Sequence, residues 1–219
     1  MILLVRVGLG EMDIVDYNCL DWLKALPAQK RHDIHQASTW DYSILCLNVT
    51  SDVNLGNMIR TACLLGCRTF YTAGRKRWDR RGSVGANHYI DVVHIPNMYD
   101  ILIDTHHPLE CSCGTCKRIC NDVLLQFIED GRFTPCFIEQ GGTSILDPSW
   151  KHAIQRPLFI YGNETHGIPW GTIEFIKNKV RDTRVLSIPQ VGVMRSHNVT
   201  TACTLTLWEY ARGQLLHRL

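Results

Sequence analysis

Several features of secreted and membrane proteins are missing from this sequence. No apolar run reaches the roughly 18 to 20 residues that a membrane-spanning helix needs. The apolar start at residues 1–7 has no basic segment before it and no small-residue cleavage site after it, so it favours a short strand over a secretory signal. We therefore expect a cytoplasmic protein with no membrane partner.

The sequence also lacks internal repeats, low-complexity stretches and a large charge imbalance. Its formal net charge is +2, which argues neither for nor against a nucleic-acid partner, because the position of the charges matters more than their sum. A length of 219 residues suits one domain with a full core and is short for two. We predict a single domain over residues 1–219.

From about residue 43 onward, the chain alternates between short apolar runs and segments with helical spacing. The apolar runs, which are typical of buried strands, cover residues 43–49, 68–72, 90–95, 135–139, 158–161 and 184–188. Strands without polar alternation, separated by helices, indicate an α/β fold with a mostly parallel sheet covered by helices on both faces.

Three segments carry the helical pattern. In the first, Leu55, Ile59 and Ala62 share one face, and Gly66 is expected to close the helix. The second is amphipathic and ends at Gly131. The last, from about residue 198 to 212, is apolar almost all round, so we expect more than one neighbour to bury it.

The first 40 residues do not share this alternation. They predict one helix from about Val15 to Leu26, stopped by Pro27, and then a polar stretch to about Thr39. We treat residues 1–40 as an N-terminal extension of the same domain.

Three loops that follow predicted strands contain unusual residues. In open α/β sheets, ligands bind at the carboxyl ends of the strands. The first loop, residues 54–62, opens a helix. There Asn54 is a natural N-cap, Gly56 permits close approach of the backbone, and Arg60 is either a functional or a plain surface cation.

The second and third loops lie in the C-terminal half of the chain. Residues 161–169 place Glu164 between two glycines, which suits close contact with a flat ligand, although ordinary turns use the same residue types. Residues 188–200 lead from the last strand into the terminal helix, where Ser196 or Asn198 is a candidate N-cap.

Taken together, the three loops resemble in order and spacing the three motifs of the SpoU family, within the SPOUT superfamily of RNA methyltransferases. Those motifs are similar to Asn-x-Gly-Asn-x-x-Arg-Thr, Gly-Asn-Glu-x-x-Gly-Ile and Ile-Pro-Met-x-Gly-x-x-x-Ser-Leu-Asn-Val-Ser. The matching residues are Asn54, Gly56, Asn57, Arg60, Thr61, Gly162, Asn163, Glu164, Gly167, Ile168, Ile188, Pro189, Gly192, Ser196, Asn198 and Val199.

The resemblance covers about residues 41–213, the expected catalytic core, and includes three departures. Gln190 stands for the usual Met, His197 for the usual Leu and Thr200 for the usual Ser. His197 is the most consequential of the three, because an imidazole there would change the polarity of the cofactor pocket or add a pH dependence.

The resemblance implies an enzyme that transfers a methyl group from S-adenosyl-L-methionine to a ribose 2′-hydroxyl of tRNA or rRNA. It also implies a SPOUT-type fold with a C-terminal trefoil knot, and a homodimer formed through the terminal helices. The expected cofactor-binding residues are Gly162, Ile188, His197, Tyr161 and Val191. The expected catalytic residues are Arg60, Asn54, Glu164, Ser196 and Asn198.

By the same resemblance, Arg60 approaches the target ribose and its phosphate. A free guanidinium is too weak a base to remove the 2′-proton alone, so it would need a phosphate or neighbouring side chains. Two alternatives remain: a non-catalytic RNA-binding relative of the same fold, and a knotted methyltransferase with a non-ribose target.

Residues 75–81 pack five cations and one tryptophan into seven positions. A solvated loop is the plain interpretation, and contact with RNA phosphates is the functional one. The candidate RNA-binding residues are Arg75, Arg77, Arg80 and Arg81.

The ten cysteines fall into two kinds of setting. Cys46, Cys63, Cys67, Cys136 and Cys203 lie in apolar periodic segments, where we expect them to act as small core hydrophobes. Cys111, Cys113, Cys116 and Cys120 gather in an insertion at residues 105–120. Their spacing permits a zinc site, but all four are local in sequence, so we expect reduced thiols and no metal.

Overall fold

The computed structural model describes residues 18–74, 77–96, 98, 115–152 and 154–216, and for residues 115–120 the backbone alone. The predicted strand at residues 1–7 lies outside these ranges. Within them, no helix has both the length and the apolar character that a membrane crossing requires.

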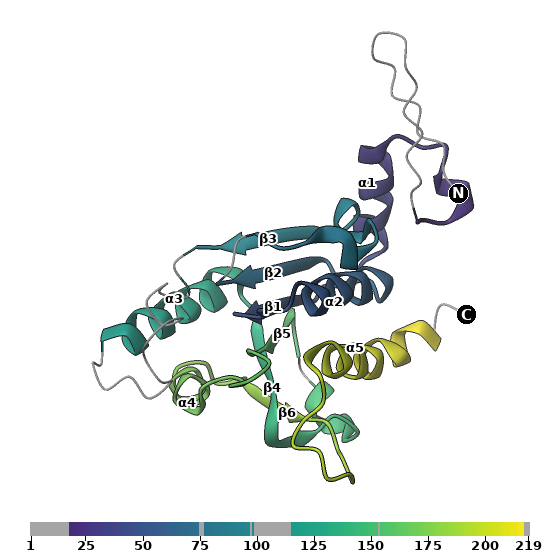
Figure 1. Cartoon of the computed structure of the whole chain (residues 1–219). Helices are drawn as coiled ribbons and strands as arrows, with labels where there is room; N and C mark the ends of the chain where they lie inside the picture. Colours follow the sequence, from purple (N-terminus) through teal and green to yellow (C-terminus); the bar gives the residue numbers. More distant parts are fainter. Residues whose placement is uncertain (1–17, 75–76, 97, 99–114, 153, 217–219) are drawn as a thin grey trace.

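Six strands form one sheet in the order β3-β2-β1-β5-β4-β6, and every neighbouring pair is parallel (Figure 1). The strands are β1 Ser43–Leu47, β2 Thr69–Ala73, β3 Asp91–Ile95, β4 Thr134–Ser144, β5 Pro157–Tyr161 and β6 Arg184–Ser187. The predicted parallel sheet is confirmed, and each strand starts within one residue of its predicted position.

Helices cover both faces of the sheet (Figure 1). They are α1 Ala28–Ser38, α2 Asp52–Leu64, α3 Thr115–Gly131, α4 Trp170–Lys177 and α5 Val199–Leu216, with 3₁₀ turns η1 Asp21–Leu23, η2 Arg80–Ser83, η3 Ala86–His88 and η5 Pro148–Lys151. Along β1, Ile44 and Cys46 pack with α2 and α5, whereas Leu45 and Leu47 pack with α3 and α4. Both faces of β1 are therefore buried, which explains its uninterrupted apolar run.

The predicted helix from Val15 to Leu26 is wrong in its described part. Residues 18–26 contain only the turn η1, and the helix α1 begins directly after Pro27. Proline at a helix start loses nothing, because the first N–H groups of a helix lack intrahelical partners and the proline φ, here −56°, suits that position. Asp91 at the start of β3 holds α1 at the sheet edge, accepting hydrogen bonds from His32 (3.0 Å) and Gln36 (3.2 Å).

The ends of α2 are set by Ser51 and Gly66. Ser51, not the predicted Asn54, is the N-cap, since its hydroxyl accepts a hydrogen bond from the Asn54 amide N–H at 3.4 Å. At the other end Gly66 has φ +74°, and the Cys67 N–H returns to the Ala62 carbonyl at 2.9 Å, so the predicted glycine closure is confirmed. The Asn54 side chain is consequently free for another role.

Only one side of α5 is covered within the single chain. Cys203, Thr206, Leu207 and Ala211 are buried, but Leu205 and Trp208 remain 38% and 51% exposed. More than one neighbour thus covers α5, because its buried side packs with α2 and with the sheet, but its opposite side stays exposed in the single chain. The trefoil knot expected for this region stays a prediction.

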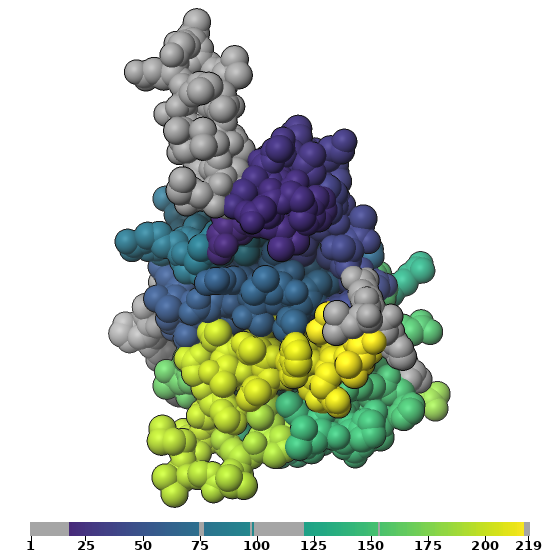
Figure 2. Space-filling model, turned by 90° about the vertical axis from the view of Figure 1, so that its right-hand side faces the viewer, coloured from purple at the N-terminus to yellow at the C-terminus, as the bar shows by residue number. Residues whose placement is uncertain are grey.

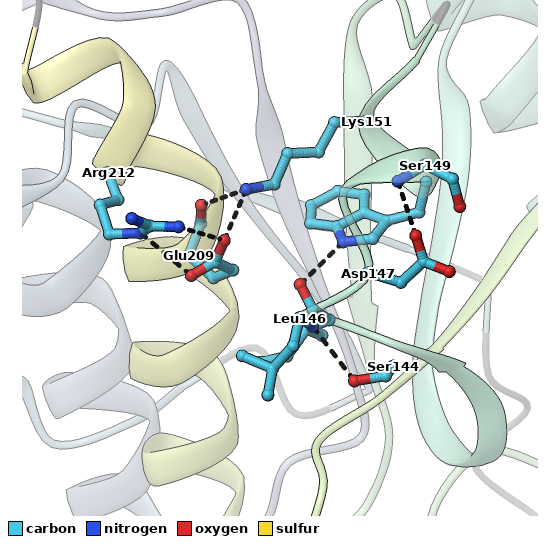
Figure 3. A network of polar contacts seen from close by, with 9 residues as sticks. Ser144, Leu146, Asp147, Ser149, Lys151, Glu209 and Arg212 are labelled. Carbon is cyan, nitrogen blue, oxygen red and sulfur yellow. Dashed lines mark hydrogen bonds and ion pairs between the residues drawn. The ribbon is translucent and has the colours of Figure 1, made fainter.

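Charged side chains fasten α5 to the segment after β4 (Figure 3). Lys151 Nζ donates to both the main-chain oxygen and Oε1 of Glu209, each at 2.7 Å. Arg212 adds two hydrogen bonds at 3.2 Å to the same carboxylate, whose side chain is only 13% exposed. The hydrogen bonds from Arg212 and Lys151 lower the pKa of Glu209.

The cysteines within the described core are buried as expected. Burial raises the pKa of Cys136 and of Cys203 to about 12, and of the part-buried Cys63 likewise to about 12. Cys46 and Cys67 are fully enclosed too. These five thiols are therefore protonated near neutral pH and act as core hydrophobes.

Removing the negative charge of Glu209 should loosen α5. We expect Glu209→Gln to lower the free energy of unfolding by about 1–2 kcal/mol, because charge-assisted hydrogen bonds to two cations are lost. Urea unfolding followed by circular dichroism measures this. The control is Glu174→Gln, whose ion pair with Lys177 is 43% exposed on both sides and should contribute under about 0.5 kcal/mol. Equal losses in the two variants would contradict the prediction.

Candidate functional site

A cavity of about 400 Å³ opens beyond the carboxyl ends of β5 and β6, beside the irregular part of β4. Its lining comes from three segments, within residues 138–140, 161–167 and 187–202. Two of these are the loops singled out in the sequence, and they meet although they are far apart along the chain. The volume lies in the range of small-molecule sites in proteins.

Most of the predicted site residues lie in the wall of this cavity. The lining includes Tyr161, Gly162, Glu164, Ile188, Ser196, His197 and Asn198. Tyr161 is 1% exposed and belongs to the core cluster, so its aromatic ring packs inward.

Asn54, Arg60 and Val191 are not part of the lining. Val191 is fully exposed in the loop before α5, and Arg60 is exposed on α2. Within the single chain, the structure therefore does not bring Arg60 to the same wall as Gly162 and His197.

Glu164 joins the second loop to the start of α2. Its Oε2 accepts hydrogen bonds from the N–H and hydroxyl of Thr50 at 3.0 and 3.1 Å. Its Oε1 accepts from the Ser51 N–H and from Asn54 Nδ2, both at 3.0 Å. Burial is the largest influence on the pKa of Glu164 and alone would raise it, but the hydrogen bonds from Thr50, Asn54 and Ser51 together lower it.

Asn54 extends this network to the third loop. While its Nδ2 donates to Glu164, its Oδ1 accepts from Asn198 Nδ2 at 3.1 Å. The Thr200 hydroxyl, at the position where the SpoU motif has serine, donates to the Asn54 main-chain carbonyl oxygen at 3.2 Å. Asn198 Oδ1 also accepts from the Thr200 N–H at 2.9 Å, which makes Asn198 the N-cap of α5. One asparagine thus connects all three motifs.

The cavity contains a second carboxylate that the sequence did not single out. Glu139 Oε2 accepts the Ile168 N–H at 3.0 Å, and Oε1 accepts the Gln140 N–H at 3.0 Å. Glu139 ends a predicted strand just before Gly141-Gly142, where β4 becomes irregular. An acid at a strand end followed by paired glycines was the available signal.

The basic loop, residues 75–81, leads into the turn η2, and η2 packs on α2. Glycine at position 56 is required because an added Cβ would lie 2.7 Å from the Gly82 backbone, so the close approach predicted there is to this turn and not to a ligand. Arg77, Arg80 and Arg81 are exposed, and Arg81 is paired with Asp79 through Nε at 2.7 Å. Arg75 lies outside the described residues.

No group of three potential metal ligands occurs among the residues that the structure describes. Cys111 and Cys113 lie outside them, and the side chains of Cys116 and Cys120 are likewise not described. The expectation of free thiols in this cluster stays a prediction.

No family model matches the chain. Over 62 residues, or 28% of this chain, it is 40% identical to the mouse (Mus musculus) tRNA (guanosine(18)-2′-O)-methyltransferase TARBP1. The chain spans only 4% of the length of that relative.

Solved structures share the fold. The SpoU methyltransferase AviRb from Streptomyces viridochromogenes has a TM-score of 0.58 and 22% identity, over 81% of this chain and 61% of that one. AviRb has also been solved in complex with AdoMet, with a TM-score of 0.57, 23% identity and coverage of 80% and 58%. The TrmH/SpoU tRNA modifying enzyme of A. aeolicus has a TM-score of 0.59 and 15% identity, over 87% and 85% of the two chains. The predicted α/β fold is confirmed, and the chain shares it with these methyltransferase structures.

Replacing the Glu164 carboxylate should destabilise the chain in a pH-dependent way. Glu164→Gln puts an amide N–H₂ where a carboxylate oxygen accepts two hydrogen bonds, which we expect to cost about 1–3 kcal/mol at pH 7. Because folding lowers the pKa of Glu164, its stabilisation is present above the unfolded value of about 4.3 and is lost as the pH falls through the folded value.

Urea unfolding between about pH 7 and about pH 3.5 measures this difference. The gap between wild type and Glu164→Gln should narrow toward the acid end. Glu129→Gln is the matched control, because Glu129 is exposed on α3. A gap that stays constant with pH would contradict the assigned role of the carboxylate.

Proposed function

We propose that the chain transfers a methyl group from S-adenosyl-L-methionine to a ribose 2′-hydroxyl of RNA, with tRNA or rRNA as the substrate. The observation that carries this proposal is the hydrogen-bond network through Asn54, which joins Glu164 to Asn198 at the edge of one cavity. Three motifs matched in sequence meet at this network and the adjoining cavity. The fold shared with AviRb, which binds AdoMet, supports the same assignment.

The cavity fits this cofactor in size and in chemistry. Apolar side chains such as Ile138, Ile188 and Ala202 offer a surface for a purine ring. The carboxylates of Glu139 and Glu164 give the wall negative charge, which favours a ligand that carries a positive sulfonium. When bound, the cofactor supplies an already activated methyl group.

Within this proposal, the protein binds and orients. Gly162, Ile188 and His197 hold the cofactor, with Tyr161 contributing from its main chain because its ring is buried in the core. Val191 is outside the lining and has no part in this set. Ser196 lines the cavity from the third loop and is available to hold the ribose hydroxyl in line with the methyl group, and Asn198, whose amide is bonded to Asn54 and Thr200, positions this loop.

Arg60 acts through a homodimer in this proposal. Val53, Arg60 and Leu64 share one exposed face of α2, because they are spaced by seven and four residues. Leu205 and Trp208 are exposed on α5, which packs beside α2, and Figure 2 shows this pair of helices uncovered on one side of the molecule. A second copy seated on this surface buries the apolar side chains and brings Arg60 into the interface.

Exposed cations give the chain a surface for the RNA backbone. Arg77, Arg80 and Arg81 are exposed in the basic loop, and Arg81 is also paired with Asp79. A single domain over residues 1–219 and a cytoplasmic location remain part of the proposal.

The alternative function is that of a non-catalytic RNA-binding relative. Such a protein would have no use for a cofactor-sized cavity, so a measurement of cofactor binding distinguishes it from a methyltransferase.

Methyl transfer and its dependence on Arg60 can be measured together. We expect wild-type protein to bind S-adenosyl-L-methionine by calorimetry and to transfer labelled methyl to one RNA fraction, with a 2′-O-methylnucleoside found by mass spectrometry. Arg60→Ala should keep the cofactor Kd within about twofold and lower transfer by about 10²–10⁴-fold, the usual contribution of proton-transfer catalysis. Absence of cofactor binding by the wild type would contradict the proposed methyltransferase function. Near-normal turnover of Arg60→Ala would contradict only the role of Arg60.

The dimer surface can be tested with two equally exposed tryptophans. We expect Trp208→Glu to weaken dimerisation by at least about 30-fold, the effect of removing an interface hot spot of about 2 kcal/mol. Trp170→Glu on α4 is the control, because Trp170 is 52% exposed and lies on the other face of the sheet. Light scattering after size exclusion reports the mass, and a monomeric wild type or an unaffected Trp208→Glu dimer would refute this surface.

A further inference from the structure

The main chain of Arg195 is held at the mouth of the cavity by two glutamines. Gln190 Nε2 donates to the Arg195 carbonyl oxygen at 3.1 Å, and Gln140 Nε2 donates to the same oxygen. Gln140 comes from β4 and Gln190 from the loop before α5. Two donors from separate segments therefore fix one carbonyl in an otherwise exposed loop.

The Arg195 guanidinium, by contrast, is available. Arg195 is exposed and lines the cavity, and its side chain has no ion-pair or hydrogen-bond partner among the residues that the structure describes. By comparison, the exposed Arg81 is paired with Asp79 and the exposed Arg212 with Glu209. A cation with a fixed backbone and an uncommitted side chain is suited to an anionic ligand.

No ion pair joins the Arg195 guanidinium to a carboxylate of the cavity wall among the residues that the structure describes. Both oxygens of Glu139 and of Glu164 already accept hydrogen bonds from main-chain N–H groups and nearby side chains. Arg195 directly precedes Ser196 and His197, which also line the cavity. An anion that reaches the guanidinium from outside therefore enters next to the proposed reaction centre.

We propose that Arg195 binds a phosphate of the substrate RNA beside the nucleotide that receives the methyl group, and that Gln140 and Gln190 are its positioning residues. This inference rests on the RNA substrate of the proposed function. The proposal also assigns a role to Gln190, because the methionine usual at that position has no hydrogen to donate to the Arg195 carbonyl.

Binding of the full chain to a fluorescently labelled tRNA, and in parallel to a labelled rRNA fragment, tests Arg195 without requiring methyl transfer. We expect Arg195→Ala to raise the RNA Kd about tenfold at low salt and to reduce the slope of log Kd against log salt by about one, because one phosphate contact is lost. Arg195→Lys should restore the slope, because it restores the charge. The cofactor Kd, measured by calorimetry, should stay within about twofold.

Arg181→Ala is the matched control. Arg181 is an exposed arginine in the turn before β6, at the amino end of the strands and so at the sheet edge opposite the cavity. Its replacement should change the RNA Kd by less than about twofold.

The positioning role has its own signature. Gln140→Ala and Gln190→Ala should each raise the RNA Kd about threefold while leaving the salt slope unchanged, because the cation is retained but less well placed. A reduced slope in these variants would refute their positioning role.

Three results would overturn the assignment of Arg195: an unchanged RNA Kd and slope in Arg195→Ala, an equal loss of cofactor affinity, or no binding of either RNA by wild type. Failure of the proposed function gives a different result. In that case tRNA or rRNA binding still depends on Arg195, while cofactor binding or methyl transfer is absent.

Discussion

The site depends on one partly buried amide that is hydrogen-bonded in two directions. Asn54 donates to Glu164 and accepts from Asn198, and these partners lie 110 and 144 positions away in the chain. Because its nitrogen and oxygen are both engaged, the orientation of the amide is determined by its partners. Neither aspartate nor leucine, although similar in size, offers one donor and one acceptor in this arrangement.

The sheet order makes this meeting possible. β1 pairs with β5 in parallel, so the loop that follows β1 and the loop that follows β5 leave the sheet side by side. β2 lies on the other side of β1, so the strand order changes direction next to β1. Open α/β sheets bind their ligands at such a point. Hydrogen bonds from the loop after β1 to Glu164, in the loop after β5, then join the two loops.

Local patterns in the sequence predicted the elements well where burial alone decided them. The strands were found because both faces of the sheet are covered, which leaves apolar runs with clear ends. Predictions from the local sequence were wrong where the chemistry of one residue suits two different roles. Pro27 can stop or begin a helix, and Asn54 can cap a helix or bridge loops; only long-range contacts decide between these roles.

The site shows the same division. The resemblance to the SpoU motifs implied that Gly162, His197 and Arg60 would line one cleft; Gly162 and His197 line one cavity, whereas Arg60 of the same chain does not. It said nothing of Glu139, whose contacts come from the Gly167–Ile168 turn, nor of the exposed face on which Arg60 stands. The contact between Gly56 and Gly82 has a mechanical consequence. Because neither residue has a side chain to act as a spacer, η2 packs directly on α2, and we expect a displacement of α2 to carry η2 and its exposed arginines with it.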